Sequence, residues 1–152
     1  MALPQFNIDG DLPIGVHLAT ISEVKALLGS TSHRRMIVMT RLERVYRLAI
    51  QTNCVAHFIV FGSFVTNKAA PNDVDVFMVM ENNFDADSLK GEVRLLFDHN
   101  AADAFFGASV FWLRRIAAFG GIQETIGHWQ NRRDGGKRGI IEVIGIKQND
   151  NE

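Results

Sequence analysis

The sequence has little of what marks secreted and membrane proteins. It contains a single cysteine, Cys54, so it cannot form an internal disulfide, which fits a reducing compartment. No apolar run approaches the roughly 20 residues that span a bilayer. Residues 1–15 also lack the charged start and the long apolar run of a signal peptide. We therefore expect a cytoplasmic protein that does not enter the membrane.

The sequence also lacks an excess of charge. Its 16 lysines and arginines face 17 aspartates and glutamates, which gives a net charge of -1 and a pI of about 6.5. This balance argues against a generally basic nucleic-acid binder, although it leaves room for a local basic patch. Apolar residues make up 47% of the chain, as is ordinary for a globular protein with a real core. We expect one domain over residues 1–152, with an irregular segment at 1–19 and a flexible tail at 148–152.

Hydrophobic periodicity and capping patterns predict the helices. Thr20, with Glu23 three residues later, forms a capping-box pattern that predicts a helix over about 21–28. In residues 33–54, apolar residues recur at spacings of three and four, which predicts the longest helix, and residues 85–101 also have a helical pattern. Five arginines fall mostly off the apolar stripe of the long helix. We interpret them as a solvated face, with a surface for phosphates or an acidic partner as the alternative: Arg34, Arg35, Arg41, Arg44 and Arg47.

Three short apolar runs predict strands, at residues 55–62, 73–80 and 139–147. Residues 107–121 stay open between a strand and a helix, because residues 110–112 favour a strand whereas the segment beyond them tolerates a helix. The order of these elements predicts an α/β (α+β) domain, in which helices flank a small mixed sheet.

Two aspartates in the second predicted strand carry the clearest chemical signal. Alternation along a strand places Asp73 and Asp75 on one face, where two nearby carboxylates repel unless a cation or hydrogen-bond donors compensate. The preceding loop opens at Gly62, which lets a ligand approach the backbone closely. A helical turn that begins near Ser63 would offer free N–H groups to a phosphate, and paired carboxylates suit Mg²⁺. These are the parts of a site for metal-assisted transfer at a nucleoside triphosphate.

The spacing of this motif resembles the signature of the polymerase-beta-like nucleotidyltransferases. Gly62 and Ser63 are followed by nine residues and then by the acid pair and an apolar strand. In that superfamily the Gly-Ser pair contacts the triphosphate and the two acids bind catalytic divalent metal, usually two Mg²⁺ ions. The resemblance therefore implies a nucleotidyltransferase fold, with Gly62, Ser63 and Lys68 as nucleotide-binding residues. It implies Asp73 and Asp75 as catalytic residues and metal ligands.

The members closest in motif and size are minimal bacterial nucleotidyltransferases that pair with HEPN-type toxins in toxin–antitoxin modules. They are described as transferring AMP onto the partner toxin. By this resemblance we expect ATP as the substrate and a protein or an RNA as the acceptor, within a toxin–antitoxin or defence module.

A second resemblance covers nearly the whole chain. It rests on "FNIDGDLPIGVH", "HRRMIVMTRL", "GSFVTNKAAPNDVDV" and "WQNRRDGGKRGIIEV". Together these segments are similar to a poorly characterised family of small bacterial nucleotidyltransferase-like proteins. In that family an N-terminal G-L-P-x-G segment and a C-terminal R-D-G-x-x-K/R-G-I segment frame the same core.

A third acid usually completes such a site on a neighbouring strand, and here its position is in question. Ser109 occupies the expected position. Asp103, shortly before it, and Glu142, much later in the chain, are the candidate acids. Two hypotheses follow. The chain is either an active nucleotidyltransferase or a catalytically degenerate binding protein of the same fold, acting as an antitoxin or a regulatory subunit.

Two other patterns have both a structural and a functional interpretation. Arg132, Arg133, Lys137 and Arg138 surround turn residues, so they indicate either an exposed hairpin or a basic loop that reaches a triphosphate, an RNA or an acidic partner. The aromatic clusters around residues 103–112 are typical of core packing. The histidines show no metal-ligand spacing, and we expect none of them to bind a metal.

Overall fold

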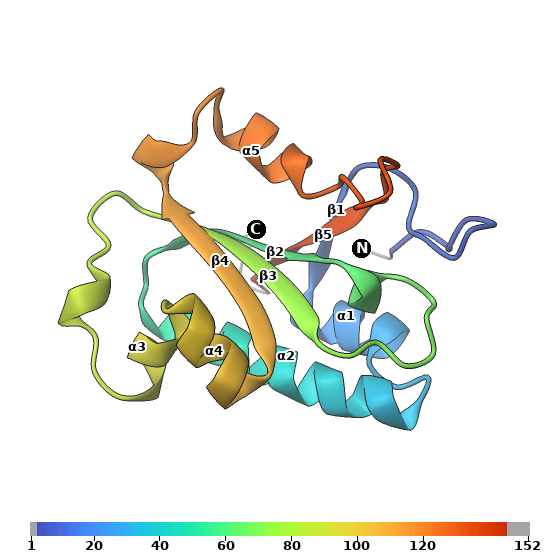
Figure 1. Ribbon diagram of the computed structural model, residues 1–152, viewed down its shortest axis with the longest axis horizontal. Helices are drawn as coiled ribbons and strands as arrows, with labels where there is room; N and C mark the ends of the chain where they lie inside the picture. Colours follow the sequence, from blue (N-terminus) through green and yellow to red (C-terminus); the bar gives the residue numbers. More distant parts are fainter. Residues whose placement is uncertain (1–2, 146–152) are drawn as a thin grey trace, which may run out of the picture.

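Five strands form one mixed sheet in this computed structural model, which describes residues 3–145 (Figure 1). The strands lie in the order β1-β5-β2-β3-β4. The outer pairs, β1 with β5 and β3 with β4, are parallel, whereas β2 is antiparallel to both of its neighbours. Their bounds are Val16–Thr20 for β1, Val55–Phe61 for β2, Val74–Met80 for β3, Ala108–Arg114 for β4 and Ile140–Ile144 for β5. The predicted α/β class, a mixed sheet with flanking helices, is confirmed.

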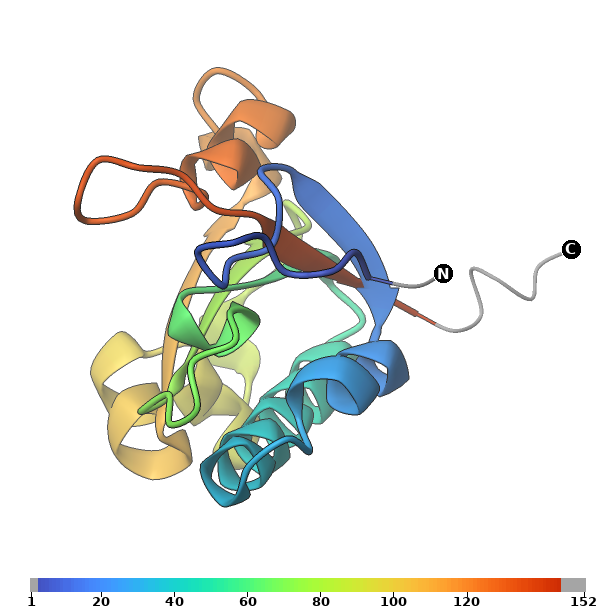
Figure 2. The ribbon, with the colours of Figure 1, turned by 90° about the vertical axis from the view of Figure 1, so that its right-hand side faces the viewer.

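Among residues 3–145, four helices lie on one face of the sheet and one lies on the other, an arrangement that Figures 1 and 2 show from two sides. The first group is α1 (Ile21–Leu28), α2 (His33–Gln51), α3 (Glu92–Leu96) and α4 (His99–Phe106), and the lone helix is α5 (Ile122–His128). Short 3-10 turns, η1 (Ser63–Val65), η2 (Ala86–Ser88) and η3 (Arg115–Ala117), follow β2, β3 and β4. Within residues 3–145, no helix combines the length and the apolarity that crossing a bilayer requires.

The two faces of the sheet bury two separate apolar clusters. Val76 and Met78 of β3 belong to the larger cluster, which contains the buried side chains of α1, α2 and α4. Phe77 and Val79 belong to the smaller cluster, together with Ile126 of α5. Because alternate side chains of a strand face opposite ways, Asp75 lies on the same face as Phe77. The sheet therefore presents the predicted acid pair on the face that carries only α5.

Local sequence signals account for the first two helices. The Thr20 hydroxyl accepts a hydrogen bond from the Glu23 N–H at 3.2 Å, and the Thr20 N–H donates to the Glu23 carboxylate at 2.8 Å. This reciprocal pair is the predicted capping box, and it begins α1 at the predicted position. The long helix is confirmed as α2, whose N-cap is Ser32. The strands predicted at 55–62 and 139–147 are confirmed as β2 and β5.

Three predictions need correction or completion. The predicted helix over 85–101 is broken into η2, α3 and α4, because Gly91 adopts a positive φ of 74° and the Asp98 side chain caps a new helix. The N-terminal segment 1–19 is not irregular throughout, since Val16–Thr20 forms β1 beside β5. The open segment 107–121 begins as strand β4. The predicted tail at 148–152 lies outside the described residues.

Candidate functional site

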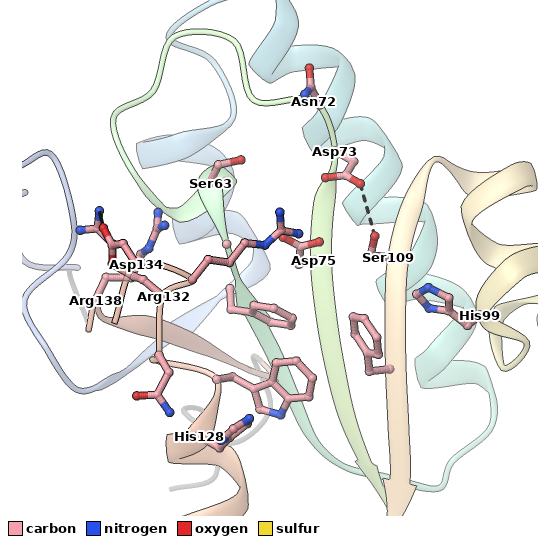
Figure 3. Close-up of a pocket in the computed structure, with 16 residues that line it drawn as sticks. Ser63, Asn72, Asp73, Asp75, His99, Ser109, His128, Arg132, Asp134 and Arg138 are labelled. Atoms are coloured by element: carbon pink, nitrogen blue, oxygen red, sulfur yellow. Dashed lines mark hydrogen bonds and ion pairs between the residues drawn. The ribbon is translucent and has the colours of Figure 1, made fainter. Parts of the chain in front are cut away.

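A cavity of about 820 Å³ opens on the α5 face of the sheet (Figure 3). Its walls come from the end of β2 with η1, the start of β3, the start of β4, the segment that runs from the end of α5 to Arg138, and His99 at the start of α4, whose ring lies 4.8 Å from that of Phe111. Gly62, Ser63, Asp73 and Asp75 all line it, so the fold brings together four of the five predicted site residues. Lys68 is exposed and does not belong to this lining.

The acid pair sits at the start of β3, between β2 and β4. Asp75 pairs in register with Phe61 on one side and with Ser109 on the other. Asp73 precedes the first residue of the strand, and its carboxylate accepts a hydrogen bond of 3.3 Å from the Ser109 hydroxyl (Figure 3). The structure therefore places Ser109 opposite the acid pair, as the sequence predicts.

Electrostatics make a charged Asp75 unfavourable. Burial, followed by the charge of Asp73, raises the pKa of Asp75 from its ordinary value of 3.8 to about 6. The Ser109 hydroxyl and the positive charges of Arg133 and Arg138 act in the opposite direction but do not cancel the shift. A bound cation would favour the charged form of this carboxylate.

Two features of the structure require glycine at position 62: its backbone conformation and the close approach of the Asp75 side chain. The φ of Gly62 is 83°, a region that favours glycine, and a Cβ atom at this position would overlap the Asp75 carboxylate. The η1 turn starts at the next residue, as predicted. Its hydrogen bonds run from the N–H groups of Val65 and Thr66 back to Gly62 and Ser63, at 3.2 and 3.3 Å. The N–H groups of Ser63 and Phe64 thus have no partner within the turn.

The buried arginine Arg35 fixes the segment that follows this turn. Its guanidinium is 2% exposed and lies among backbone carbonyls rather than carboxylates. It donates to the carbonyls of Phe64 at 2.8 Å, Lys68 at 2.9 Å and Leu28 at 3.1 Å, and also to the Thr66 carbonyl. The interpretation of this arginine as part of a solvated face is therefore wrong. No local signal separates it from its neighbours in α2, because its partners come from distant segments.

The loop after α5 supplies the positive side of the cavity. Arg132, Arg133 and Arg138 line it, and an isolated bridge between Asn131 and Lys137 gives the loop its hairpin form. The structural interpretation, a hairpin, is therefore confirmed, and three arginines of the loop line the same cavity as the acid pair. That the loop reaches a triphosphate, an RNA or an acidic partner stays a prediction.

Asp11 is a site residue that the sequence analysis missed. Its carboxylate is 6% exposed and pairs with Arg132 at 2.9 Å and with Arg138 at 3.7 Å. Its backbone forms a bridge with Thr66, just after η1. The "GDLP" segment thus joins the arginine loop to the turn at Ser63. The sequence does contain a signal for the role of Asp11. In the family that the whole chain resembles, a segment like "GDLP" and a segment like the arginine loop frame the core motif.

Neither candidate for a third acid lies in the cavity lining. Asp103 is exposed on α4, and Glu142 pairs with His57 at 2.6 Å. Among the described residues, no group of three or more His, Cys, Asp or Glu side chains could hold a metal ion. Two carboxylates do fit one Mg²⁺ ion, which commonly binds one or two carboxylates and completes its shell with substrate phosphates and water.

The fold and the cavity together define an α+β protein whose site places two carboxylates opposite three arginines. The chain belongs to a family of unknown function, DUF6932, whose model matches residues 4–144. That span includes Asp11, the acid pair and the arginine loop. Searches of curated proteins and of solved structures gave no match.

Proposed function

We propose that this protein is a Mg²⁺-dependent nucleotidyltransferase that moves a nucleoside monophosphate, AMP from ATP, to a protein or RNA acceptor. The observation that carries the proposal is one cavity in which Asp73 and Asp75 face Arg132, Arg133 and Arg138. Carboxylates alone would repel a triphosphate, and arginines alone would bind any anion. The two sets together suit a ligand that brings both phosphates and a divalent cation.

Each part of the cavity has a role in this reaction. The arginines and the first N–H groups of η1 would bind the β- and γ-phosphates, because guanidinium groups and turn N–H groups both donate to phosphate oxygens. Asp73 and Asp75 would hold Mg²⁺, which supplies charge neutralisation at the phosphates. The acceptor oxygen attacks the α-phosphorus, the bond to the β-phosphate oxygen breaks, and pyrophosphate leaves. The proton of the acceptor hydroxyl passes to solvent.

Arg133 is the arginine best placed to bind the substrate. Arg132 and Arg138 are paired with Asp11, and Arg132 is also paired with Asp134 at 2.7 Å. Arg133 is exposed and forms no ion pair with the described residues, although its charge acts on Asp75. An incoming phosphate can therefore contact this guanidinium without breaking an existing pair.

One observation favours a second candidate function, that of a degenerate binding protein. Ser109 stands opposite Asp75, where the nucleotidyltransferases carry a third acid. The other carboxylate that lines the cavity among the described residues, Asp134, is paired with Arg132 at 2.7 Å. A protein of this kind would bind a partner, as an antitoxin or a regulatory subunit does. Its binding would survive the loss of Asp73 and Asp75.

A labelling experiment separates the two functions. Wild-type protein is incubated with cell extract, Mg²⁺ and ATP labelled at the α-phosphate, beside the Asp73→Asn, Asp75→Asn double variant. The matched control is the Asp87→Asn, Asp103→Asn variant, which removes two exposed carboxylates outside the cavity. We expect Mg²⁺-dependent label on an acceptor from the wild type and the control, and none from the site variant.

Two results would decide against the enzyme. Equal labelling by the site variant would show that the acid pair is not involved. Binding of ATP and Mg²⁺ in calorimetry, without labelling of any acceptor, would favour the degenerate binding protein.

A further inference from the structure

Aromatic rings form one side of the cavity, and such rings are ligands neither of phosphate nor of Mg²⁺. Phe61, Phe111 and Trp129 all line the cavity. Their ring centroids are 4.6 Å apart for Phe61 and Trp129, 5.2 Å for Phe111 and Trp129, and 6.3 Å for Phe61 and Phe111. We call these three residues the aromatic wall. They come from β2, β4 and the end of α5, so the fold, rather than a local sequence pattern, assembles them.

The sheet register places the aromatic wall directly beside the acid pair. Phe61 pairs with Asp75, so the two lie about 4.8 Å apart across neighbouring strands. Phe111 follows Ser109 by two residues and therefore points to the same face, about 7 Å further along β4. A ligand whose phosphates lie at Asp75 would thus bring whatever is attached to them against the rings.

The wall differs from ordinary core packing in its exposure. Phe77 contacts Trp129 at a centroid distance of 5.0 Å, is 2% exposed and belongs to the core. Phe111 pairs in register with Phe77 on the neighbouring strand, contacts the same tryptophan, and is 36% exposed. Phe61 and Trp129 are partly buried against the smaller core cluster, so the wall joins that core to the cavity. The sequence interpretation of Phe111 as core packing is incomplete for this reason.

Charge is divided along the cavity in the way a nucleotide requires. Arginines and carboxylates line the cavity together with Ser63 and the start of β3, whereas His128 lies away from Ser63 and the acid pair (Figure 3). The His128 ring centroid is 5.7 Å from that of Trp129, so the rings of the wall continue toward this end. Flat, uncharged and aromatic groups stack on such rings, and nucleobases gain binding free energy in this way. The flat base of a nucleotide matches the rings, and the phosphates of the same nucleotide match the charged end of the cavity.

We propose that the aromatic wall binds the base of a purine nucleotide, which stacks on Phe111 and Trp129 while the triphosphate lies toward the arginines. This assignment rests on the proposed function and names the substrate class of the same site. A purine presents a larger ring surface than a pyrimidine, so the wall favours ATP or GTP over CTP or UTP.

Trp129 can report on stacking once the second tryptophan is removed. The chain has two tryptophans, and Trp112 packs on the opposite face of the sheet against Phe84 and Phe97. In the Trp112→Phe variant, the fluorescence of Trp129 is followed during titration with Mg²⁺ and one of three ligands: ATP, CTP or inorganic tripolyphosphate. We expect strong quenching by ATP and weaker binding of CTP. Tripolyphosphate should displace ATP without quenching.

Substitution of the exposed ring tests the wall directly. Phe111→Ala should weaken ATP binding roughly ten-fold, in line with the loss of one stacking partner, and leave tripolyphosphate binding unchanged. The matched control is Phe105→Ala, which removes a half-exposed phenylalanine of α4 outside the cavity. Because Phe111 also contacts Phe61, His99 and Trp129, the variant should unfold at a lower temperature than the wild type, and a thermal scan verifies that both variants are folded at the temperature of the titration.

The outcomes separate this assignment from the function on which it rests. If ATP labels an acceptor but neither quenches Trp129 nor binds more weakly to the Phe111→Ala variant, the wall does not bind the base and the assignment is overturned. Equal affinity for ATP and CTP would overturn the purine preference. If the wild type binds no nucleotide at all, the assignment and the proposed function fail together.

Discussion

Replacing Asp75 with asparagine should make the metal-free protein more stable at neutral pH, although it removes a side chain that the proposed reaction needs. Asparagine has nearly the same shape as aspartate and carries no charge. The variant therefore keeps the packing at the start of β3 and loses the unfavourable charge beside Asp73.

The magnitude follows from the pKa shift. Asp75 has a pKa of about 6 in the folded protein, against 3.8 ordinarily, so the folded state binds the proton more tightly than the unfolded state. Stability therefore falls as pH rises through the window between these values, and the full penalty is present above it. The shift corresponds to an upper limit of about 3 kcal/mol, which solvent screening of this partly exposed side chain reduces to about 1–2 kcal/mol.

Urea unfolding with a chelator present, at pH 4, 5, 6 and 7.5, measures this difference. We expect the Asp75→Asn variant to exceed the wild type by about 1–2 kcal/mol at pH 7.5, and the gap to close near pH 4. Added Mg²⁺ at pH 7.5 should stabilise the wild type more than the variant. A variant that is less stable at pH 7.5, or a gap that does not change with pH, would refute the electrostatic account of this site.

Two further substitutions test how the turn at Ser63 is held. Arg35→Met should lower the free energy of unfolding by about 3 kcal/mol, because it leaves buried carbonyls without a hydrogen-bond donor. Urea unfolding measures this loss, and a loss below about 1 kcal/mol would contradict the role of Arg35. Gly62→Ala should cost about 2 kcal/mol through backbone strain and overlap with Asp75. Combining it with Asp75→Gly should recover part of that loss, and no recovery would show that the overlap is unimportant.

Patterns within short segments predicted much of the fold. The capping box at Thr20 and the periodicity of α2 depend only on residues a few positions apart, so the sequence reveals them directly. β1 was missed because its strand partner within residues 3–145 is β5, more than a hundred residues later in the chain. A strand at the edge of a sheet needs little local signal when a distant strand supplies its hydrogen bonds.

The residues of the candidate site also fall into two groups, those that local sequence patterns predict and those that they do not. The acid pair and Gly62 could be predicted because strand alternation and glycine conformation act locally. Arg35 could not, because its burial depends on carbonyls from a loop that folds back over α2. The aromatic wall could not be predicted either, since Phe61 and Trp129 become neighbours only when α5 packs on the sheet.

Two segments near the ends of the described chain, the one around Asp11 and the arginine loop, lie side by side, and Asp11 is the residue that joins them. Its carboxylate holds Arg132 and Arg138, and its backbone pairs with Thr66 beyond the turn at Ser63. A buried carboxylate with two arginine partners fixes both guanidinium groups, whereas Arg133 is exposed and its charge acts on Asp75. A shorter chain that kept only the strands and the acid pair would lose this arrangement. The site therefore depends on segments near both ends of the described chain, and the family match over residues 4–144 includes them.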